Sequence, residues 1–583
     1  MLAKDSLNSA KNPHFAVIAK AVICHLWKTE LRRLEPGTFE SAVMSASPVT
    51  AKSASTVIAE RLFEAGARFA FGIPGGEVLA LMDALDKAGM SVNLVKHENS
   101  GGFMAEGTYH ATGAPGVLFA TIGPGIANAA NTIANAWQDR VPLIVLTGCV
   151  PAVEQHTYTH QVFDHVAMLK PVTKASFRVE PGTAGILIDK ALKIATSGRL
   201  GPVMLDVPID VQRKVRDTWI MPKHRPEVAT VPATGPLAQA NDWLADAKRP
   251  LVIAGLDAID DENAGAVASF CRDRQIPLIT TYKAKGILPE GDALALGGAG
   301  LSPVADKILL PLVGAADCIL MAGYDPIEMR PGWQDVVTPE QRVIDITAEG
   351  NTHYMHQSAL NVVGGIAETL EALGPSGDTA AWVSGPVTDA KQALIQAFQA
   401  NEGWGPAAVV DEARKACPPG TIASVDSGAH RIVLSQIWET DVPRGLIQST
   451  ALCTMGCAVP LAMGRKLAEP DRPVIAFVGD AGLEMFLGEL ATARDLKLGL
   501  PIVVFVDEQL GLIELKQRGS QMPNLGVEFG ATDFTRVAEA MGGYGETCRD
   551  RKSLNDAISA AFERDSFTLV SAVIGRNAYD GRI

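Results

Sequence analysis

Two aspartates, Asp480 and Asp507, are placed where a chain could hold a divalent cation against a diphosphate. Asp480 follows an apolar run and precedes the small residues Ala481 and Gly482, while Asp507 comes 27 residues later, directly after the apolar segment 501–506. Mg²⁺ prefers oxygen ligands in an octahedron and keeps part of its coordination for phosphate. Small residues at the start of the next helix would let backbone N–H groups approach the phosphates. Taken alone, the pattern could equally be an ordinary strand, turn and helix.

A second group of chemically useful residues lies far upstream, in a part of the chain where apolar runs alternate with helical stretches. This rhythm predicts a parallel sheet, and ligands bind at the carboxyl ends of the strands of such sheets. Glu98 is predicted at the end of the strand 92–98, and the Gly123-Pro124-Gly125 turn follows the strand 116–122. Both are therefore predicted to lie near a ligand.

Together, the motifs Lys96–Asn99, Gly123–Asn128, Gly479–Asp480 and Asp507 resemble the thiamine-diphosphate-dependent enzymes, in the branch that contains acetolactate synthase. The resemblance covers roughly residues 52–575. The fold class that it implies is α/β, with three doubly wound parallel-sheet domains. We expect a pyrimidine-binding domain over residues 52–222, a central domain over 236–375, and a diphosphate- and magnesium-binding domain over 400–575.

The resemblance also implies roles for individual residues. A Glu at the position of Glu98 hydrogen-bonds the pyrimidine ring and promotes loss of the thiazolium proton, and a Gln at the position of Gln161 reaches the reacting centre. Asp480, Asp507 and the main-chain oxygen of Gln509 resemble the Mg²⁺ ligands. The other predicted cofactor contacts belong to the same strand-end motifs and are Ile73, Pro74, Gly123, Asn128, Ser427, Gly428, Ala429, His430, Cys453, Met455, Ala481, Gly482, Leu510, Gly511 and Leu512.

Some of these residues have simpler readings, and two depart from the family pattern. Glu98 could be a surface residue at a strand end, and a lone Met such as Met455 is more often core filling. The family usually has Gly at the position of Ala481 and an Asn at that of Asp507. An Asp keeps the oxygen ligand and adds a negative charge, which suits Mg²⁺.

The activity implied is that of a carboligase, which decarboxylates a 2-oxo acid such as pyruvate and condenses the two-carbon unit with a second 2-oxo acid. Simple decarboxylases tend to carry a proton-donating Glu at the position of Ile513. Ile513 cannot supply a proton, but the adjacent Glu514 could if the alignment were shifted by one residue. A decarboxylase releasing an aldehyde is therefore an alternative. A non-catalytic cofactor-binding relative is another, disfavoured by intact Glu98 and Asp480. The segments around Gln161 and over 322–328 are closest to the catabolic, flavin-free branch, so FAD is not expected.

Composition limits the possible partners and location. The chain has 583 residues and a formal net charge of −14, which makes nucleic acid an unsuitable partner. Its eight cysteines show no paired spacing, which favours reduced thiols and a cytoplasmic location. Residues 1–50 are predicted to be a poorly ordered extension or a loosely attached helix, whose apolar stretch 16–27 is too short to span a membrane. A targeting peptide is the alternative, because basic residues outnumber acidic ones up to Arg33. The resemblance implies a homodimer or homotetramer with active sites between subunits and small 2-oxo acids as substrates.

Overall fold

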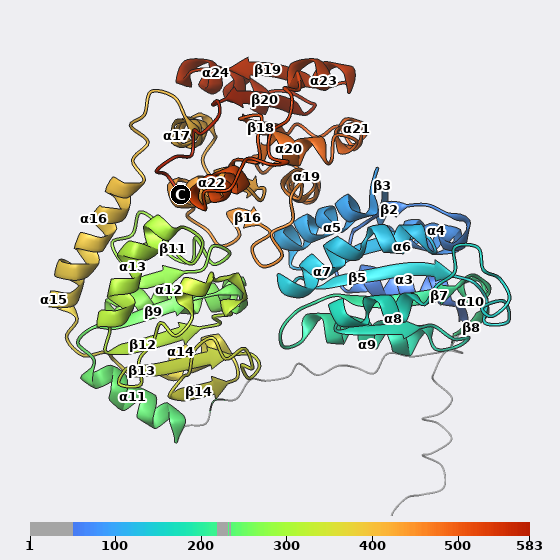
Figure 1. The fold of residues 1–583 in the computed structure, drawn as a ribbon. Helices are drawn as coiled ribbons and strands as arrows, with labels where there is room; N and C mark the ends of the chain where they lie inside the picture. Colours follow the sequence, from blue (N-terminus) through green and yellow to red (C-terminus); the bar gives the residue numbers. More distant parts are fainter. Residues whose placement is uncertain (1–50, 218–230, 232–234) are drawn as a thin grey trace, which may run out of the picture. The chain divides into compact units, whose positions relative to one another are not determined.

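A computed structural model describes residues 51–217, 231 and 235–583. The predicted extension 1–50 lies outside the described residues, as does most of the Pro-rich segment that precedes residue 236. Three six-stranded sheets, parallel in every described pairing, organise the chain from Lys52 onward (Figure 1). This confirms the predicted α/β fold class with parallel sheets. A short antiparallel pair, β1 (Lys52–Ser53) with β8 (Val215–Asp217), flanks the first sheet.

The first sheet has the strand order β3-β2-β4-β5-β7-β6. Helices cover both of its faces because alternate side chains point to opposite sides of a strand. In β4, Leu118 joins the core beneath α5 and α7, whereas Val117 and Phe119 join the core beneath α3, α4 and α9. The elements are β2 (Phe69–Ile73), β3 (Ser91–Leu94), β4 (Gly116–Ala120), β5 (Leu143–Cys149), β6 (Ala175–Arg178), β7 (Val203–Pro208), α3 (Ala54–Glu64), α4 (Leu79–Lys87), α5 (Glu98–Thr112), α6 (Pro124–Asn128), α7 (Ala130–Gln138), α8 (His165–Leu169), α9 (Ala184–Thr196) and α10 (Ile209–Gln212).

The central sheet has the order β11-β10-β9-β12-β13-β14, which is the strand order of dinucleotide-binding folds. One face packs under α11, α12 and α14, and the other packs under α13 and α16. The elements are β9 (Pro250–Ala254), β10 (Leu278–Thr280), β11 (Ala295–Gly298), β12 (Cys318–Ala322), β13 (Arg342–Thr347), β14 (Leu360–Val363), α11 (Pro236–Asp246), α12 (Asp261–Arg274), α13 (Pro303–Ala315), α14 (Ile366–Ala372), α15 (Ala380–Trp382) and α16 (Thr388–Ala397).

The third sheet, β16-β15-β17-β18-β20-β19, repeats the topology of the first. In both sheets the chain order of the strands across the sheet is second, first, third, fourth, sixth and fifth. The elements are β15 (Ile422–Val425), β16 (Leu446–Gln448), β17 (Val474–Gly479), β18 (Pro501–Val506), β19 (Tyr544–Cys548), β20 (Thr568–Val573), α17 (Pro406–Ala416), α18 (Ala429–Ile437), α19 (Ala458–Ala468), α20 (Asp480–Glu484), α21 (Glu489–Asp495), α22 (Gly511–Gly519), α23 (Phe534–Ala540) and α24 (Arg551–Phe562).

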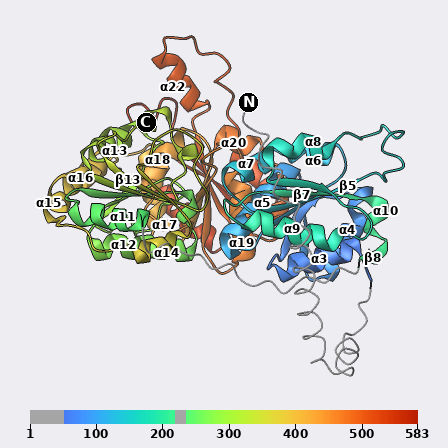
Figure 2. The same cartoon turned by 90° about the horizontal axis from the view of Figure 1, so that it is seen from below.

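The first and third sheets share one hydrophobic core, in which α5 packs directly against α19 (Figure 2). Two glycines allow this close approach. A Cβ on Gly107 of α5 would lie 2.3 Å from the Leu461 carbonyl oxygen, and one on Gly464 of α19 would lie 2.0 Å from the Met104 carbonyl oxygen. Any larger residue at either position would therefore push the helices apart.

A group of buried charges, here called the junction cluster, connects all three sheets. Its members are Lys283 and Glu328 from the central part of the chain, and Glu106 and Asp139 from the first. Lys283 Nζ lies 3.0 Å from Asp139 Oδ2 and 3.5 Å from Glu106 Oε1. Thr450, from the third part, donates its hydroxyl to Glu328 Oε1 at 3.1 Å.

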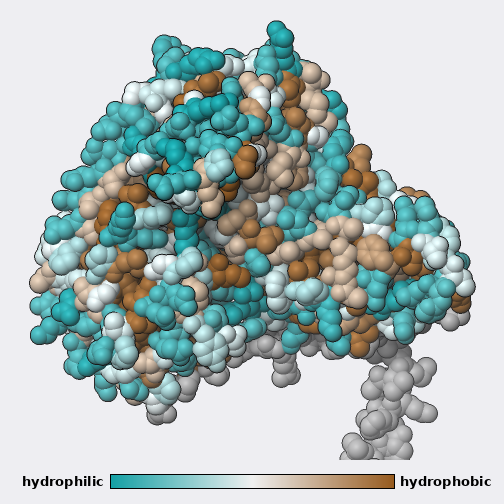
Figure 3. Space-filling view, viewed as in Figure 1, coloured by the Kyte–Doolittle hydropathy of each residue, from teal (hydrophilic) through white to brown (hydrophobic). Residues whose placement is uncertain are grey.

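Polar side chains cover most of the face seen in Figure 3, with apolar residues in small groups between them. Within the described residues, no helix combines the length and hydropathy needed to cross a membrane.

Candidate active site

The predicted site residues lie at and beside the carboxyl ends of the strands where the order of the first and third sheets reverses. In the first sheet these strands are β2 and β4, which lead into Ile73-Pro74 and the Gly123 turn. In the third sheet they are β15 and β17, which lead into Ser427 and Asp480. Crevices at such positions are the usual ligand sites of open parallel sheets.

Glu98 lies at the first of these edges, but it begins a helix and does not end a strand as the sequence predicted. Strand β3 stops at Leu94 and α5 starts at Glu98, because His97 caps the helix by accepting a hydrogen bond from Asn99 N at Nδ1 (3.1 Å). The Glu98 side chain is buried, and its Oε2 accepts a hydrogen bond from Asn128 Nδ2 at 3.1 Å. Glu98 is therefore not the surface residue that the simpler interpretation proposed.

The Gly123 turn brings Gln161 to the same edge. Gly123 has φ +68°, and a Cβ there would lie 2.5 Å from the Gln161 carbonyl oxygen. Gln161 itself has φ +60° and an exposed side chain. The structure thus groups five predicted residues around the ends of β2 and β4, near Glu98: Ile73, Pro74, Gly123, Asn128 and Gln161.

Asp480 and Asp507 form the second group, at the ends of β17 and β18. Both are buried, and Asp480 Oδ2 accepts hydrogen bonds from the backbone N–H groups of Asp507 (3.0 Å) and Glu508 (2.8 Å). Burial and then the neighbouring Asp480 carboxylate raise the pKa of Asp507 to about 8. Burial also raises the pKa of Asp480. Two buried carboxylates that repel each other are a suitable donor set for a cation.

Ser427 and His430 flank these carboxylates. Within the described residues, Ser427 Oγ and His430 Nε2 are buried and have no hydrogen-bond partner, and the His430 ring stacks on Phe505 (centroids 5.2 Å apart, planes at 20°). Burial, and secondarily Arg431, lowers the pKa of His430 to about 3. The imidazole is therefore neutral. Unpaired buried polar atoms of this kind are expected where a polar ligand binds.

Asp426 organises this half of the site, although its side chain was not predicted to take part. It accepts hydrogen bonds from Gly456 N (2.8 Å) and Cys457 N (3.0 Å), directly after Met455. A Cβ on Gly482 would lie 2.2 Å from Asp426 Oδ2, so the Asp480–Gly482 turn packs against the same carboxylate. Burial raises the pKa of Asp426 to about 6.

The remaining predicted residues lie on the same edge of the third sheet. Cys453 has φ +58° and its Sγ is 3.2 Å from Arg431 Nη2. Gln509 is buried and its backbone pairs with Glu528, while a Cβ on Gly511 would lie 2.8 Å from Asp507 Oδ2. The other predicted contacts on this edge are Gly428, Ala429, Ala481, Leu510 and Leu512.

The two groups are connected within the chain through Glu489, but not through their own carboxylates. Glu489 Oε1 accepts hydrogen bonds from Lys96 N (2.9 Å) and His97 N (3.0 Å), immediately before Glu98. Among the described residues, no hydrogen bond or ion pair joins Glu98 to Asp480 or Asp507.

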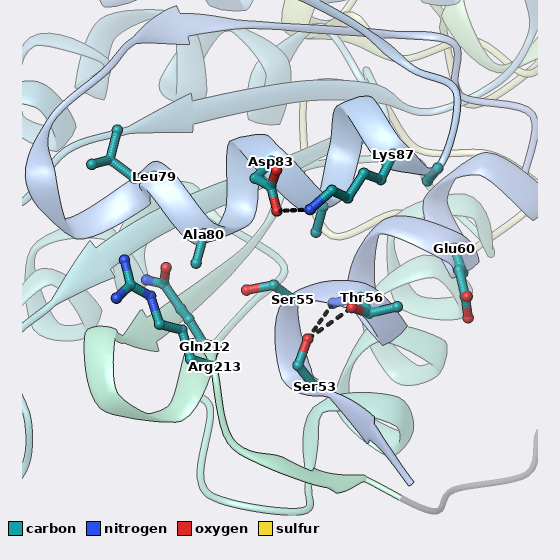
Figure 4. Close-up of a pocket in the computed structure, with 12 residues that line it drawn as sticks. Ser53, Ser55, Thr56, Glu60, Leu79, Ala80, Asp83, Lys87, Gln212 and Arg213 are labelled. Atoms are coloured by element: carbon teal, nitrogen blue, oxygen red, sulfur yellow. Dashed lines mark hydrogen bonds and ion pairs between the residues drawn. The ribbon is translucent and has the colours of Figure 1, made fainter. Parts of the chain in front are cut away.

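A cavity of about 590 Å³ between α3 and α4 contains none of the predicted residues (Figure 4). Its charges are largely balanced, since Lys87 pairs with Asp83 at 2.7 Å. It therefore indicates no particular ligand.

The residues at the third sheet fit a magnesium diphosphate. In the described part of the chain, no three His, Cys, Asp or Glu side chains are grouped as a self-contained metal site. Asp480 and Asp507 would supply only part of an octahedron, which leaves positions for a main-chain oxygen and for phosphate, as Mg²⁺ prefers. The unpaired Ser427 and His430 atoms lie in the same region of the fold.

Comparison with known proteins identifies the class. Residues 52–168 match the thiamine pyrophosphate enzyme N-terminal TPP binding domain, residues 237–373 the central domain, and residues 426–572 the C-terminal TPP binding domain. The chain therefore belongs to the thiamine pyrophosphate enzyme family, whose cofactor is thiamine diphosphate.

Within this family the chain is acetolactate-synthase-like. It is 30% identical to the acetolactate synthase large subunit of Parasynechococcus marenigrum over 90% of this chain and 88% of the relative. It is 28% identical to the acetolactate synthase of Bacillus subtilis over 89% of this chain and 92% of the relative. It is 30% identical to the acetolactate synthase isozyme 1 large subunit of Escherichia coli over 78% and 82%.

Proposed function

We propose that this protein is a thiamine-diphosphate-dependent carboligase, which decarboxylates pyruvate and joins the two-carbon unit to a second 2-oxo acid, giving an acetolactate. The observation that carries this proposal is the pair of half-sites beside the order reversals of two sheets with the same topology. One half-site has Glu98 after β3, and the other has Asp480 after β17 and Asp507 after β18. When bound, the cofactor supplies the nucleophilic carbon and the electron sink that release of CO₂ requires.

Glu98 and Gln161 are the proposed catalytic residues. Burial keeps Glu98 away from water, and Asn128 holds its Oε2, so the other oxygen is free to bond a ring nitrogen and exchange a proton with it. Gln161, held beside the Gly123 turn with an exposed side chain, would reach toward the substrate.

Asp480, Asp507 and the main-chain oxygen of Gln509 are the proposed Mg²⁺ ligands. The raised pKa of Asp507 supports this role, because a cation would relieve the repulsion between two buried carboxylates. Ser427 Oγ and His430 Nε2 would gain hydrogen-bond partners from the diphosphate. Met455, which directly precedes the two N–H groups bound by Asp426, would support the bent cofactor.

The environment of Ile513 supports carboligation over simple decarboxylation. Ile513 has no proton to give, and the adjacent Glu514 is buried and pairs with Arg518 through both oxygens, at 3.0 and 3.1 Å. Neither residue is therefore suited to protonate a product carbon. A decarboxylase that releases an aldehyde remains the second candidate, since other proton donors could serve it.

We further propose that the protein does not use FAD. A crevice at the carboxyl ends of β9, β13 and β14 in the central sheet is lined by four acidic residues, Asp257, Asp260, Glu262 and Glu368, and by two arginines, Arg140 and Arg444. Arg140, which also lines it, is paired with Asp325 at 2.8 Å. Carboxylates at this position would repel the diphosphate of a dinucleotide.

The proposed active unit is a homodimer or a homotetramer in the cytoplasm, with each site shared between subunits and domain limits at 52–222, 236–375 and 400–575. Among the described residues, no hydrogen bond or ion pair joins Glu98 to Asp480 or Asp507 within one chain, which supports active sites that are shared between subunits. Exposed apolar side chains also accompany both edges, with Val153, Tyr158 and Phe163 beside Gln161 and with Met485, Ile513, Met522 and Leu525 on the third sheet. Surfaces of this kind favour burial against a second copy.

Product analysis tests the function. The protein is incubated with pyruvate, with and without thiamine diphosphate and Mg²⁺, and CO₂, acetaldehyde and acetolactate are measured together. We expect acetolactate that depends on both additions. Acetaldehyde alone would favour the decarboxylase, and no CO₂ would mean that pyruvate is not the donor, so that larger 2-oxo acids should be tried.

A further inference from the structure

A buried chain of polar side chains lies behind the Gly123 turn. His165, the first residue of α8, is 2% exposed, and Asp206 of β7 is 3% exposed. His165 Nδ1 lies 3.0 Å from Asp206 Oδ1, and Gly123 N donates a hydrogen bond to His165 Nε2 at 3.3 Å. Arg178 holds the far side, with Nη1 3.7 Å from Asp206 Oδ2 and Nη2 donating to the Val150 carbonyl at 2.8 Å. His165, Asp206 and Gly123 come from three separate elements, the start of α8, strand β7 and the turn after β4.

These contacts define the tautomer of His165. A carboxylate only accepts hydrogen bonds, so Nδ1 of the neutral ring must carry the proton that faces Asp206. Nε2 then has a free lone pair, which is what the Gly123 N–H requires. A ring with its proton on Nε2 would instead present a donor to a donor.

The hydrogen bond from Gly123 N to His165 holds the backbone of the Gly123 turn in place. Gly123 has a left-handed φ of +68°, and the turn is pressed against the Gln161 carbonyl. The same turn opens α6, whose last residue, Asn128, donates to Glu98 Oε2. A displacement at Gly123 would therefore move both Gln161 and the group that orients Glu98.

We propose that His165, held in its Nδ1–H form by Asp206, is a positioning residue that fixes the Gly123 turn and through it Asn128 and Glu98. This inference rests on the proposed function, which it deepens by assigning a residue that acts through the catalytic groups without touching the substrate. A cavity of about 210 Å³ borders His165, Asp206 and Arg178. The Phe163 ring packs edge-on against the imidazole, with centroids 4.9 Å apart, and the cavity leaves room for substituted side chains.

Two variants of His165 separate positioning from simple packing. In His165→Gln the amide oxygen can accept from Gly123 N, whereas His165→Leu has a similar volume and no acceptor. An unpaired buried N–H costs enough to lower kcat by about tenfold to a hundredfold if the turn moves. We expect that loss in His165→Leu, with little change in KM, and near-normal turnover in His165→Gln.

Asp206→Asn tests the tautomer directly. Arg178 only donates, so the amide oxygen of the Asn is favoured on the side of Arg178 and the amide NH2 faces Nδ1. The ring proton is then driven onto Nε2, against the Gly123 N–H. We expect a loss of kcat as large as in His165→Leu. In the His165→Gln background the same change should have little effect, because no tautomer remains to be set. If His165→Leu does not fold, the effect of Asp206→Asn in the wild-type background, compared with its effect in His165→Gln, still tests the role of the His165 tautomer.

The affinity for thiamine diphosphate in the presence of Mg²⁺, measured by titration calorimetry, provides a readout independent of turnover. We expect it to fall severalfold in His165→Leu and Asp206→Asn and to be kept in His165→Gln. Equal behaviour of the Leu and Gln variants in both assays, or an Asp206→Asn variant like the wild type, would overturn the inference. A wild type that binds the cofactor but makes no acetolactate would count against the proposed function instead, and the affinity comparison would still test His165.

Discussion

At the scale of single residues, Glu98 is the side chain on which turnover should depend most. It is buried, and the only described hydrogen bond to its carboxylate, from Asn128, leaves one oxygen free. Replacing it with Gln keeps the shape but removes the exchangeable proton. We expect Glu98→Gln to lose acetolactate formation by at least about a hundredfold, while calorimetry shows cofactor binding retained. Glu563→Gln, at an exposed helix end, is the matched control. Normal turnover in Glu98→Gln would contradict the mechanism.

The residues that could be predicted from the sequence are those close after strands. Asp480 and Asp507 directly follow apolar runs and Glu98 comes shortly after β3, and the resemblance to a known family was needed to choose the functional interpretation over an ordinary strand and turn. Asp426, Glu489 and His165 were not predicted as site residues, because their partners come from other strands or from another sheet. Glu489, for example, binds Lys96 and His97 of the first sheet. A single sequence contains no signal for such a pairing.

At the scale of elements, the crossing of α5 and α19 sets the distance between the two sheets that carry the half-sites. We expect Gly107→Ala to lower the free energy of unfolding by about 1–3 kcal/mol, because the new methyl group would overlap the α19 backbone. Chemical denaturation measures this change. Gly265, on an exposed turn of α12 with open space around it, provides the control. There the same substitution should be neutral or stabilising by up to about 1 kcal/mol.

An equal effect of the two alanines would mean that helix propensity, and not the crossing, determines the result. The apolar runs 116–122 and 501–506 were sufficient to predict strands of the first and third sheets, since buried parallel strands are continuously apolar. The crossing itself was not predictable, because nothing in the spacing of Gly107 indicates that Gly464 lies opposite. Helix capping by His97 likewise overrode the strand predicted up to Glu98.

At the scale of the whole molecule, the sharing of active sites between subunits can be tested by complementation. Glu98→Gln and Asp480→Asn are each expected to be inactive. When the two are coexpressed, random pairing makes about half of the dimers mixed, and each mixed dimer has one intact site if sites are shared. We therefore expect about a quarter of wild-type activity in the mixture. Activity no higher than that of the separate variants would mean that each site is formed within one chain.

The junction cluster makes the stability of the molecule sensitive to pH. Burial raises the pKa of Glu328 to about 7, although Lys283 opposes the shift. Because the folded pKa is above the unfolded value, the stability that this group contributes is present at low pH and is lost as pH rises through about 7. The Glu328→Gln variant has a neutral group at every pH and does not lose this stability. The difference in free energy of unfolding, variant minus wild type, should therefore increase by about 2–3 kcal/mol from pH 5 to pH 8. Denaturation curves at both pH values measure this, and a constant difference would contradict it.

The shared core of the first and third sheets has a consequence for how the chain comes apart. Side chains of β4, β17, α5 and α19 belong to one apolar cluster, whereas the central sheet is enclosed by two clusters of its own. Segments that are far apart in the sequence must therefore melt cooperatively, while the part of the chain between them has the means to melt separately. In a calorimeter, the outer two thirds of this fold should absorb heat as one unit, so loss of either half-site on heating entails loss of the other.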